Sequence, residues 1–369
     1  MALDGSKPAG AKAEAIEKAR KLLETGGAPR TKSVPGGIIT NDTVSVNDPR
    51  DVKKAERSTK AKAQVLDNAK LEGEALLGLS PKDRERYQKV KDTLLTPSPG
   101  KPHGDPVAAL ALQTMLLEGK LPGAKALGSK DTLLSGLEKM ATQEVGHGID
   151  RQQLLADVVQ EVASPSAVSQ TTKGTCSVTT AQIQLMRDNP AEYVRLVSGL
   201  ASPAGEVQTV GGDVLKVEPA ALTDATGRSV SQRLLAPALM ELGNGTADYQ
   251  NGADLSFGGD WDQKSGLHTG QVDRVLESIT GQKHAWTTQG KTEKQQRAVV
   301  ATVAAQLEAG KSVMVGLTWT EGGGHQVLAV GTEQRNGGEY VKIINPWGTE
   351  ESIPRAEFDA RLISTNYES

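Results

Sequence analysis

The sequence predicts an α+β fold, in which helices come first along the chain and antiparallel strands follow. Ala, Lys, Glu and Leu, which favour helices, dominate long stretches before residue 165. Three β-rich segments lie close together near the C-terminal end, and the last two flank an Asn-Gly-Gly turn that is typical of a hairpin. These segments are 312–319, 325–332 and 339–345.

Aromatic residues divide the chain into two unequal parts. Up to Cys176 the only aromatic residue is Tyr87, whereas all four Trp, both Phe and the other four Tyr follow it. Because aromatic side chains bury large areas, the C-terminal part is better equipped to form a core. We expect a flexible helical region at 1–104, a helical segment at 105–165 that docks on or regulates the next domain, and a folded domain at 166–369. A disordered charged arm is the alternative for the first region.

Six helices are predicted before residue 165. Ser80 and Pro81 form a typical N-cap and first-turn proline, and Asp150 and Ser129 are candidate caps of later helices. Segments rich in Gly and Pro at 27–48 and 96–106 are predicted linkers. The predicted helices are 11–25, 49–79, 81–95, 106–119, 130–143 and 150–163.

The C-terminal part is predicted to mix helices, turns and strands. A helix follows Cys176 and ends at Asn189-Pro190, and residues 192–230 are expected to form short strands and turns, with a hairpin at 207–219. Further helices are expected at 231–243, 270–280 and 295–310.

Charge and composition exclude several classes of protein. Lys and Arg outnumber Asp and Glu by 26 to 22 up to Cys176, and Asp and Glu outnumber them by 23 to 16 afterwards. No basic stripe with interleaved aromatics is present, so we expect no nucleic-acid partner. No apolar run approaches the roughly 20 residues of a membrane span, and no secretory signal opens the chain. We therefore expect a protein that is cytoplasmic as synthesised, with export that needs no cleavable signal as the alternative.

Cys176 is the candidate nucleophile. It is the only cysteine, so no intrachain disulfide is possible and a structural zinc site is not expected. It opens a predicted helix whose apolar residues Val178, Ala181 and Leu185 lie at helical spacing. The N-terminus of a helix stabilises a thiolate, which is the reactive form of cysteine. The alternative is an inert cysteine in the core.

His325 and Asn345 lie at the two ends of the predicted hairpin. Their midpoint is residue 335, inside the turn, so the two residues are expected to face one another across the strands. An imidazole that acts as a base needs such a partner to fix its tautomer. An ordinary hairpin that ends in a polar pair is the alternative, and a bulge would shift the pairing.

Gln170 lies six residues before Cys176. Its side-chain amide is a candidate to reach the vicinity of the nucleophile across the intervening loop. Together with the backbone N–H of Cys176, it would bind the negative oxygen that develops during attack on a carbonyl.

These motifs, in this order, resemble the papain-type cysteine peptidases, and the Asn-Pro-Trp-Gly sequence at 345–348 is most similar to the calpain branch. The resemblance implies a papain-like two-subdomain fold, with a helical subdomain that carries the cysteine and a β subdomain that carries the histidine. It implies Cys176 as nucleophile, His325 as acid and base, and Asn345 as the residue that orients the histidine. Gln170 becomes part of the oxyanion hole, and Trp347 shields the bond between Asn345 and His325 from water.

Two positions depart from the family pattern. Ser177 stands where the family usually has Trp, and Gln326 stands where it usually has a small residue. No acidic loop matches a calpain calcium site, so we expect no cofactor or metal, with calcium left open.

We therefore expect a cysteine endopeptidase that hydrolyses a protein or peptide substrate through an acyl-enzyme. Self-cleavage in one of the N-terminal linkers is a further expectation. One alternative is the same triad acting as a glutamine deamidase, transglutaminase or acyltransferase, as in a bacterial effector or toxin. Another is a degenerate site that only binds. The N-terminal region is also a candidate inhibitor of the cleft, or an arm for export or partner binding.

Overall fold

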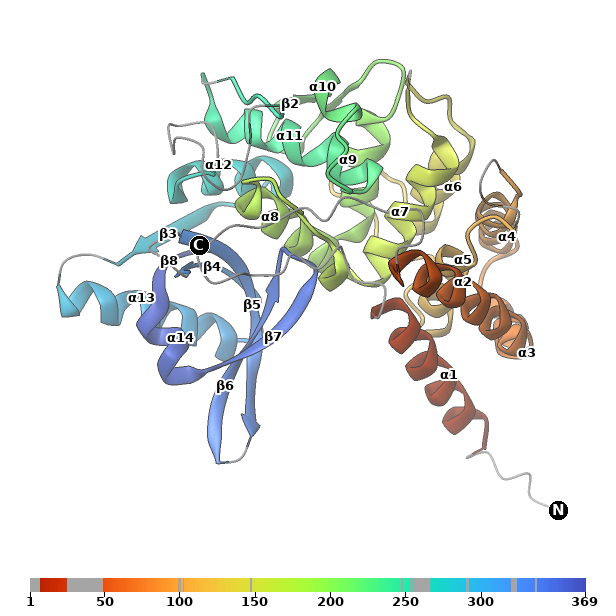
Figure 1. Ribbon diagram of the computed structural model, residues 1–369, viewed down its shortest axis with the longest axis horizontal. Coiled ribbons are helices and arrows are strands. Elements are labelled where there is room, and N and C mark those ends of the chain that lie inside the picture. The colour runs from red at the N-terminus through yellow and green to blue at the C-terminus, as the bar shows by residue number, and fades with distance from the viewer. Residues whose placement is uncertain are drawn as a thin grey trace.

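The computed structural model describes residues 7–24, 49–98, 101, 103–146, 148–246, 248–252, 254, 266–289, 292–319, 324–335 and 337–369. Helices occupy most of the chain up to residue 280, and a six-stranded antiparallel sheet follows, so the α+β prediction is confirmed. The sheet and the N-terminal helices lie at opposite ends of the molecule, and α8 (Cys176–Asp188) lies between them (Figure 1).

Four helices form the N-terminal end of the molecule. Ser80 caps the last of them, because its Oγ accepts a hydrogen bond from Asp83 N at 3.1 Å, and Pro81 occupies the first turn as predicted. The single helix predicted at 49–79 is two helices instead. The break falls at Asn68, whose buried side chain donates to Gln113 Oε1 at 3.1 Å. The four helices are α1 (Lys7–Glu24), α2 (Pro49–Asp67), α3 (Ala69–Leu76) and α4 (Pro81–Leu95).

These helices pack around α5 (Pro106–Leu117), in which every residue is buried. Next come α6 (Leu133–Thr142) and α7 (Arg151–Ala163). Asp150 caps α7 as predicted, with its Oδ1 2.9 Å from Gln153 N. The cap of α6 is Thr132 and not Ser129, because Thr132 lies directly before the first helical residue and Ser129 Oγ binds Asp131 N in the preceding turn.

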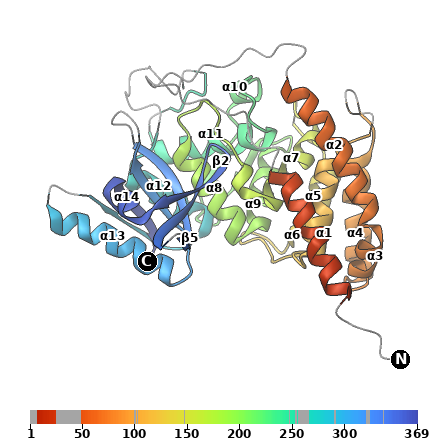
Figure 2. The same cartoon turned by 60° about the horizontal axis from the view of Figure 1, so that its bottom comes forward.

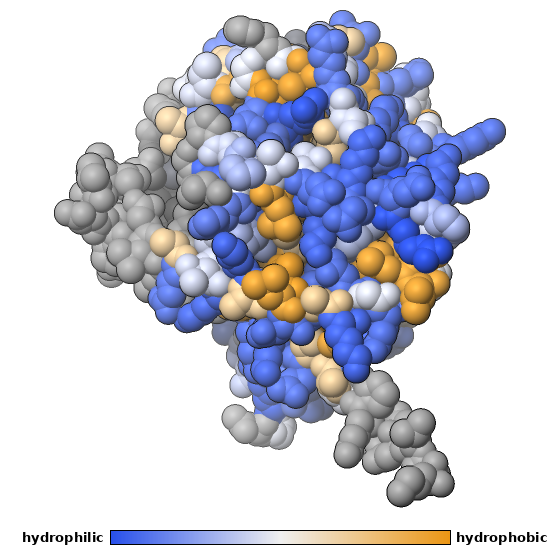
Figure 3. Space-filling view, turned by 90° about the vertical axis from the view of Figure 1, so that its right-hand side faces the viewer, coloured by the Kyte–Doolittle hydropathy of each residue, from blue (hydrophilic) through white to orange (hydrophobic). Residues whose placement is uncertain are grey.

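The face formed by the N-terminal helices is mostly hydrophilic, and its hydrophobic residues occur in small separate groups (Figure 3). Leu66 and Leu77 are the most exposed large hydrophobic residues in the described part of the chain. Single exposed leucines are common on protein surfaces and need no partner to explain them.

The short 3-10 helix η1 (Pro165–Ala167) leads toward α8, and α8 is followed by two helices that the sequence did not predict, one directly after it and one of four residues after the hairpin. Asn189 ends α8, and its Oδ1 accepts from Glu192 N at 2.9 Å, so the same residue caps α9 (Pro190–Leu200). The prediction of strands and turns from residue 192 is therefore wrong up to Leu200, whereas the predicted hairpin is present. It consists of β1 (Glu206–Gln208) and β2 (Val214–Lys216), and is followed by α10 (Pro219–Leu222), α11 (Val230–Asn244) and α12 (Thr269–Thr280).

The C-terminal sheet has the strand order β3-β8-β4-β5-β6-β7, and every pairing is antiparallel. The three predicted strands are β4, β5 and β6, whereas β3, β7 and β8 were not predicted. The predicted helix at 295–310 is α13. The bounds are β3 (His284–Thr288), α13 (Glu293–Glu308), β4 (Val313–Thr318), β5 (Gly324–Arg335), β6 (Gly338–Asn345), β7 (Thr349–Pro354), α14 (Arg355–Arg361) and β8 (Leu362–Glu368).

Side chains from the two faces of the sheet pack in two different hydrophobic cores. Leu328 and Ile344 join a large core that also contains buried residues from α1 to α12. Val327 and Ile343 face the other way and pack in a smaller core with α13 and α14. This alternation follows from the two-residue period of a strand. The sheet thus lies between the helical part and α13 and α14, and the N-terminus of α8 meets the beginning of β5 (Figures 1 and 2).

Candidate active site

His325 and Asn345 come together at one end of the sheet. His325 is the second residue of β5, and Asn345 is the last residue of β6. The imidazole Nε2 lies 2.9 Å from Asn345 Oδ1, and both side chains are buried. The structure therefore joins two residues that are 20 positions apart in the sequence.

The two residues do not face one another directly, as the sequence analysis expected. The register shifts between Ala329 and Gly331, and the last pair before the site is Leu328 with Ile344. Continued by three residues, this register would place residue 347 opposite His325, and so Asn345 is a diagonal neighbour. Asn345 is two residues from the position opposite His325, and both side chains lie on the same face because strands alternate with a period of two.

The hydrogen bonds of Asn345 define which imidazole nitrogen carries the proton. Asn345 Nδ2 donates to Glu351 Oε1 at 2.8 Å, which turns Oδ1 toward His325 and toward the Trp347 N–H at 3.2 Å. An amide oxygen can only accept, so His325 Nε2 is the donor of the bond between them. His325 Nδ1 then holds a free lone pair and is the nitrogen that can act as a base.

Two tryptophans surround the imidazole of His325. Trp347 stacks on it with a centroid distance of 4.5 Å, and Trp319 meets it edge-on at 4.9 Å. Burial lowers the pKa of His325 to about 4, against the opposing effects of the Asn345 hydrogen bond and the Glu351 charge. The imidazole is therefore neutral at neutral pH in this structure.

Cys176 is the first residue of α8 and its side chain is half-buried. Burial raises the pKa of its thiol, while the backbone N–H groups of Gln326 and Ser177 act in the opposite direction. Gln326 directly follows His325, so the thiol approaches β5 beside the candidate base. The helix is fixed there, because Thr180 Oγ1 donates to the Gln326 carbonyl at 3.1 Å. Between Cys176 and His325, both of which are described, the structure has no direct hydrogen bond.

Gln170 is buried in the loop before α8 and lies next to the Asn-Pro-Trp-Gly turn. Its backbone N donates to Pro346 O at 2.7 Å, and the preceding Ser169 pairs with Trp347 as an isolated β-bridge. The side-chain Nε2 donates to Lys173 O at 2.7 Å. The amide is thus held against the loop that leads to Cys176, and its nitrogen carries a second hydrogen that can donate.

A buried network that the sequence analysis missed fixes the backbone before Cys176. Lys173 Nζ donates to the carbonyls of Asn251 and Asp254 at 2.6 and 2.9 Å. The Asp254 carboxylate accepts from Gly174 N at 2.9 Å and from the Tyr249 hydroxyl at 2.7 Å. These partners are about 80 residues apart in the sequence, with separations of 78, 80 and 81 for the bonds to Lys173 and Gly174, so no local pattern could have indicated them.

The two positions that depart from the papain pattern are both buried. The Gln326 side chain shares a sheet face with Leu328 and lies over Gly316, where a Cβ atom would come within 3.7 Å of Gln326 Oε1 and 2.5 Å of Ser364 Oγ. Glycine at 316 therefore provides the space for Ser364, whereas a Cβ atom there would make only an ordinary contact with Gln326. Ser177 is buried in the first turn of α8.

In the described part of the chain, no group of three or more His, Cys, Asp and Glu side chains is arranged to hold a metal ion. None of the described helices is both long enough and apolar enough to cross a membrane.

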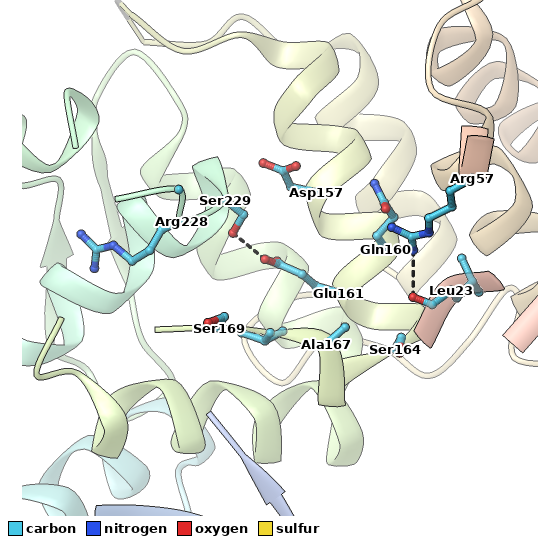
Figure 4. A pocket seen from close by; sticks show the side chains of 12 residues that line it. Leu23, Arg57, Asp157, Gln160, Glu161, Ser164, Ala167, Ser169, Arg228 and Ser229 are labelled. Atoms are coloured by element: carbon cyan, nitrogen blue, oxygen red, sulfur yellow. Dashed lines mark hydrogen bonds between the residues drawn. The ribbon is translucent and has the colours of Figure 1, made fainter. Parts of the chain in front are cut away.

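A pocket of about 170 Å³ is lined by residues of α7, of the segment at 164–169 and of the segment that leads into α11 (Figure 4). Asp157, which is half-buried, and Glu161, which is buried, lie one turn apart on α7 and contribute two carboxyl groups, and Ser229 Oγ donates to Glu161 at 2.6 Å. Burial and the neighbouring Asp157 charge raise the pKa of Glu161 to about 7, and burial raises the pKa of Asp157 to about 6. Ser169 also lines this pocket, so it shares a wall with the loop that carries Gln170.

Comparisons of the chain with protein-family models and with curated proteins find no match. The interpretation of the site therefore rests on its geometry and chemistry.

Proposed function

We propose that this chain is a papain-like cysteine hydrolase that cleaves peptide bonds with Cys176 as nucleophile, His325 as base and Asn345 as the residue that orients the base. The observation that carries the proposal is the hydrogen bond of 2.9 Å between His325 Nε2 and Asn345 Oδ1. This bond leaves Nδ1 of His325 unprotonated, and His325 directly precedes Gln326. The Gln326 N–H in turn contacts the Cys176 thiol. The helical part that carries the thiol and the sheet that carries the imidazole would be the two subdomains of the papain-like fold.

The proposed reaction moves one proton through His325. As Cys176 Sγ bonds to the carbonyl carbon of the substrate, the thiol proton passes to Nδ1. The imidazolium then gives this proton to the leaving nitrogen as the carbon–nitrogen bond breaks, which leaves a thioester. A water molecule loses a proton to Nδ1, attacks the thioester and releases the acid, and the proton returns to Sγ.

Groups that are already in place would stabilise the charges that develop in this reaction. The Cys176 N–H and the Gln170 amide would bind the oxyanion, a role worth roughly 3–4 kcal/mol of barrier for one donor. Burial favours the neutral forms of both the thiol and the imidazole in the unliganded site. We therefore infer that proton transfer accompanies the attack and does not precede it.

Cleavage of a denatured proteome tests this proposal. We expect wild-type protein to generate new N-termini that the Cys176→Ala variant does not generate. If no bond is cut but a single protein gains about one dalton or an adduct, the triad instead serves a deamidase or a transferase. If Cys176→Ala gives the same products as wild type, or if neither reaction occurs with any substrate, the hydrolase proposal is wrong.

Self-processing of the N-terminal region is a separate part of the proposal. The linker predicted at 27–48 lies outside the described residues, and exposed linkers are favoured by proteases. We expect wild-type protein to lose a segment that ends within 27–48 or 96–106 on incubation, and Cys176→Ala to keep its full mass. Equal masses and N-termini after long incubation would exclude self-cleavage.

A further inference from the structure

We propose that Glu351 is a positioning residue of this site, which orients the Asn345 amide and so sets the tautomer of His325. This inference rests on the proposed function for its consequence in catalysis. Its structural part, the orientation of the amide and of the proton, can be tested without any activity.

The contacts of Glu351 determine its effect on Asn345. Its Oε1 accepts from Asn345 Nδ2 at 2.8 Å and from Thr349 Oγ1 at 2.8 Å. A carboxylate at this place can only accept, so it selects the amide orientation in which Nδ2 faces Glu351 and Oδ1 faces His325. In the opposite orientation two oxygens would meet, and Nδ2 would face His325. The Trp347 N–H favours the same orientation, but its bond is longer, at 3.2 Å.

The position of Glu351 in the sheet explains its contact with Asn345. Thr349 pairs with Asn345, and Glu351 pairs with Ile343, so Glu351 lies two residues beyond the pair that contains Asn345. Residues two apart on a strand share a face, and the diagonal neighbour across the ladder is within reach of a long side chain. Glu350 lies between them, is exposed and belongs to the opposite face.

Glu351 also contributes charge to the site. The charged groups that act on the imidazole are Glu351 from β7 and Arg361 from the end of α14. Glu351 favours the imidazolium and Arg361 disfavours it. Among the described residues no Lys or Arg forms an ion pair with Glu351, which accepts hydrogen bonds from Asn345 and Thr349. An imidazolium that forms during the reaction would therefore be stabilised through Asn345.

Nitrogen NMR of the His325 ring tests the structural part, and it is best performed in the Cys176→Ala background, where no thiol titrates. We expect the Nε2–H tautomer to be the main neutral form, and Glu351→Ala to shift the ring measurably toward the Nδ1–H form. Glu351→Gln should keep most of the Nε2–H form, because its Oε1 can still accept from Asn345 Nδ2. Glu350→Ala removes the same charge one residue away, and should leave the tautomer unchanged.

Kinetics test the catalytic part in the chain that retains Cys176. We expect Glu351→Ala to lower kcat about 10-fold with little change in KM, a typical loss when a group that orients a reactive histidine is removed. Glu351→Gln should fall between Glu351→Ala and wild type, and Glu350→Ala should match wild type. A ring that stays in the Nε2–H form in Glu351→Ala, or a Glu351→Gln tautomer as disturbed as that of Glu351→Ala, would overturn the inference. If the protein shows no hydrolysis but the tautomer shifts as expected, the proposed function fails and the positioning role stands.

Discussion

The Nε2 atom of His325 lies 2.9 Å from Oδ1 of Asn345, across the diagonal of an antiparallel pair of strands. This single bond defines the tautomer of the imidazole, because the Asn345 oxygen also accepts from a backbone N–H and cannot donate. The free Nδ1 nitrogen then belongs to the part of β5 that approaches the N-terminus of α8.

Replacement of Asn345 by alanine is expected to weaken catalysis without preventing substrate binding. The imidazole would lose its acceptor at Nε2 and would populate both tautomers, so only a fraction of the protein would hold a free Nδ1. We expect kcat/KM to fall about 10- to 100-fold, mostly through kcat. Steady-state kinetics against a peptide substrate provide the measurement, and an unchanged kcat would show that Asn345 does not orient the base.

Replacement of Trp347 by alanine is expected to raise the pKa of His325. Burial is the main cause of its low pKa of about 4, and the Trp347 ring covers one face of the imidazole. Removing the ring would admit water and move the pKa toward its ordinary value of about 6.5. Proton NMR titration in the Cys176→Ala background measures this change. Trp286→Ala, at an exposed position in β3, is the matched control, and an unchanged titration in Trp347→Ala would contradict the role of burial.

Replacement of Lys173 by methionine is expected to destabilise the loop before Cys176. The carbonyls of Asn251 and Asp254 would lose a buried donor, at a cost of about 1–3 kcal/mol for each group left without a partner. We expect a lower melting temperature and a reduced kcat, because Gly174 and Cys176 follow directly in the chain. Lys70→Met, on the exposed side of α3, is the control in thermal denaturation. Equal melting temperatures for the two variants would show that the bonds of Lys173 to Asn251 and Asp254 do not stabilise the loop.

Glu161 is expected to make the stability of the protein depend on pH. Its pKa is raised to about 7 by burial and by Asp157, above the ordinary value of about 4.5, so the folded state binds the proton more tightly than the unfolded state. The stabilisation from this group is complete below about pH 4.5 and is lost as the pH rises through about 7, on the order of 3 kcal/mol in total.

Glu161→Gln removes this titration, so its unfolding free energy should fall less between pH 4.5 and 7 than that of the wild type. Denaturant unfolding at several pH values measures the slope. Glu144→Gln, at an exposed position, should behave like wild type, and a Glu161→Gln slope equal to the wild-type slope would rule out the effect.

The sequence predicted the local features of the site better than its long-range ones. The helix that begins at Cys176 and the strands that begin near His325 and end at Asn345 are confirmed, because caps, turns and hydrophobic periodicity are local signals. The diagonal contact differs from the expected pairing because the pair next to the turn is Arg335 with Gly338, so the turn is not centred on residue 335, and because the register shifts by one residue between Ala329 and Gly331.

Other features depend on residues that are far apart in the chain. The bonds of Lys173 to the segment at 251–254 and the pairing of β8 with β3 and β4 bring together segments without any shared motif. The helix α9 was missed for a different reason. Asn189 both ends α8 and caps α9, and only its first role was considered.

The most direct test of the site is the labelling of Cys176 by a thiol-directed peptidyl electrophile in folded protein at neutral pH, followed by mass spectrometry. We expect one adduct, on Cys176, and labelling at least about 10 times slower in His325→Ala, since a base that takes up the thiol proton typically contributes 100-fold or more. Equal rates in wild type and His325→Ala, or no adduct on folded wild-type protein, would show that the thiol and the imidazole do not act together.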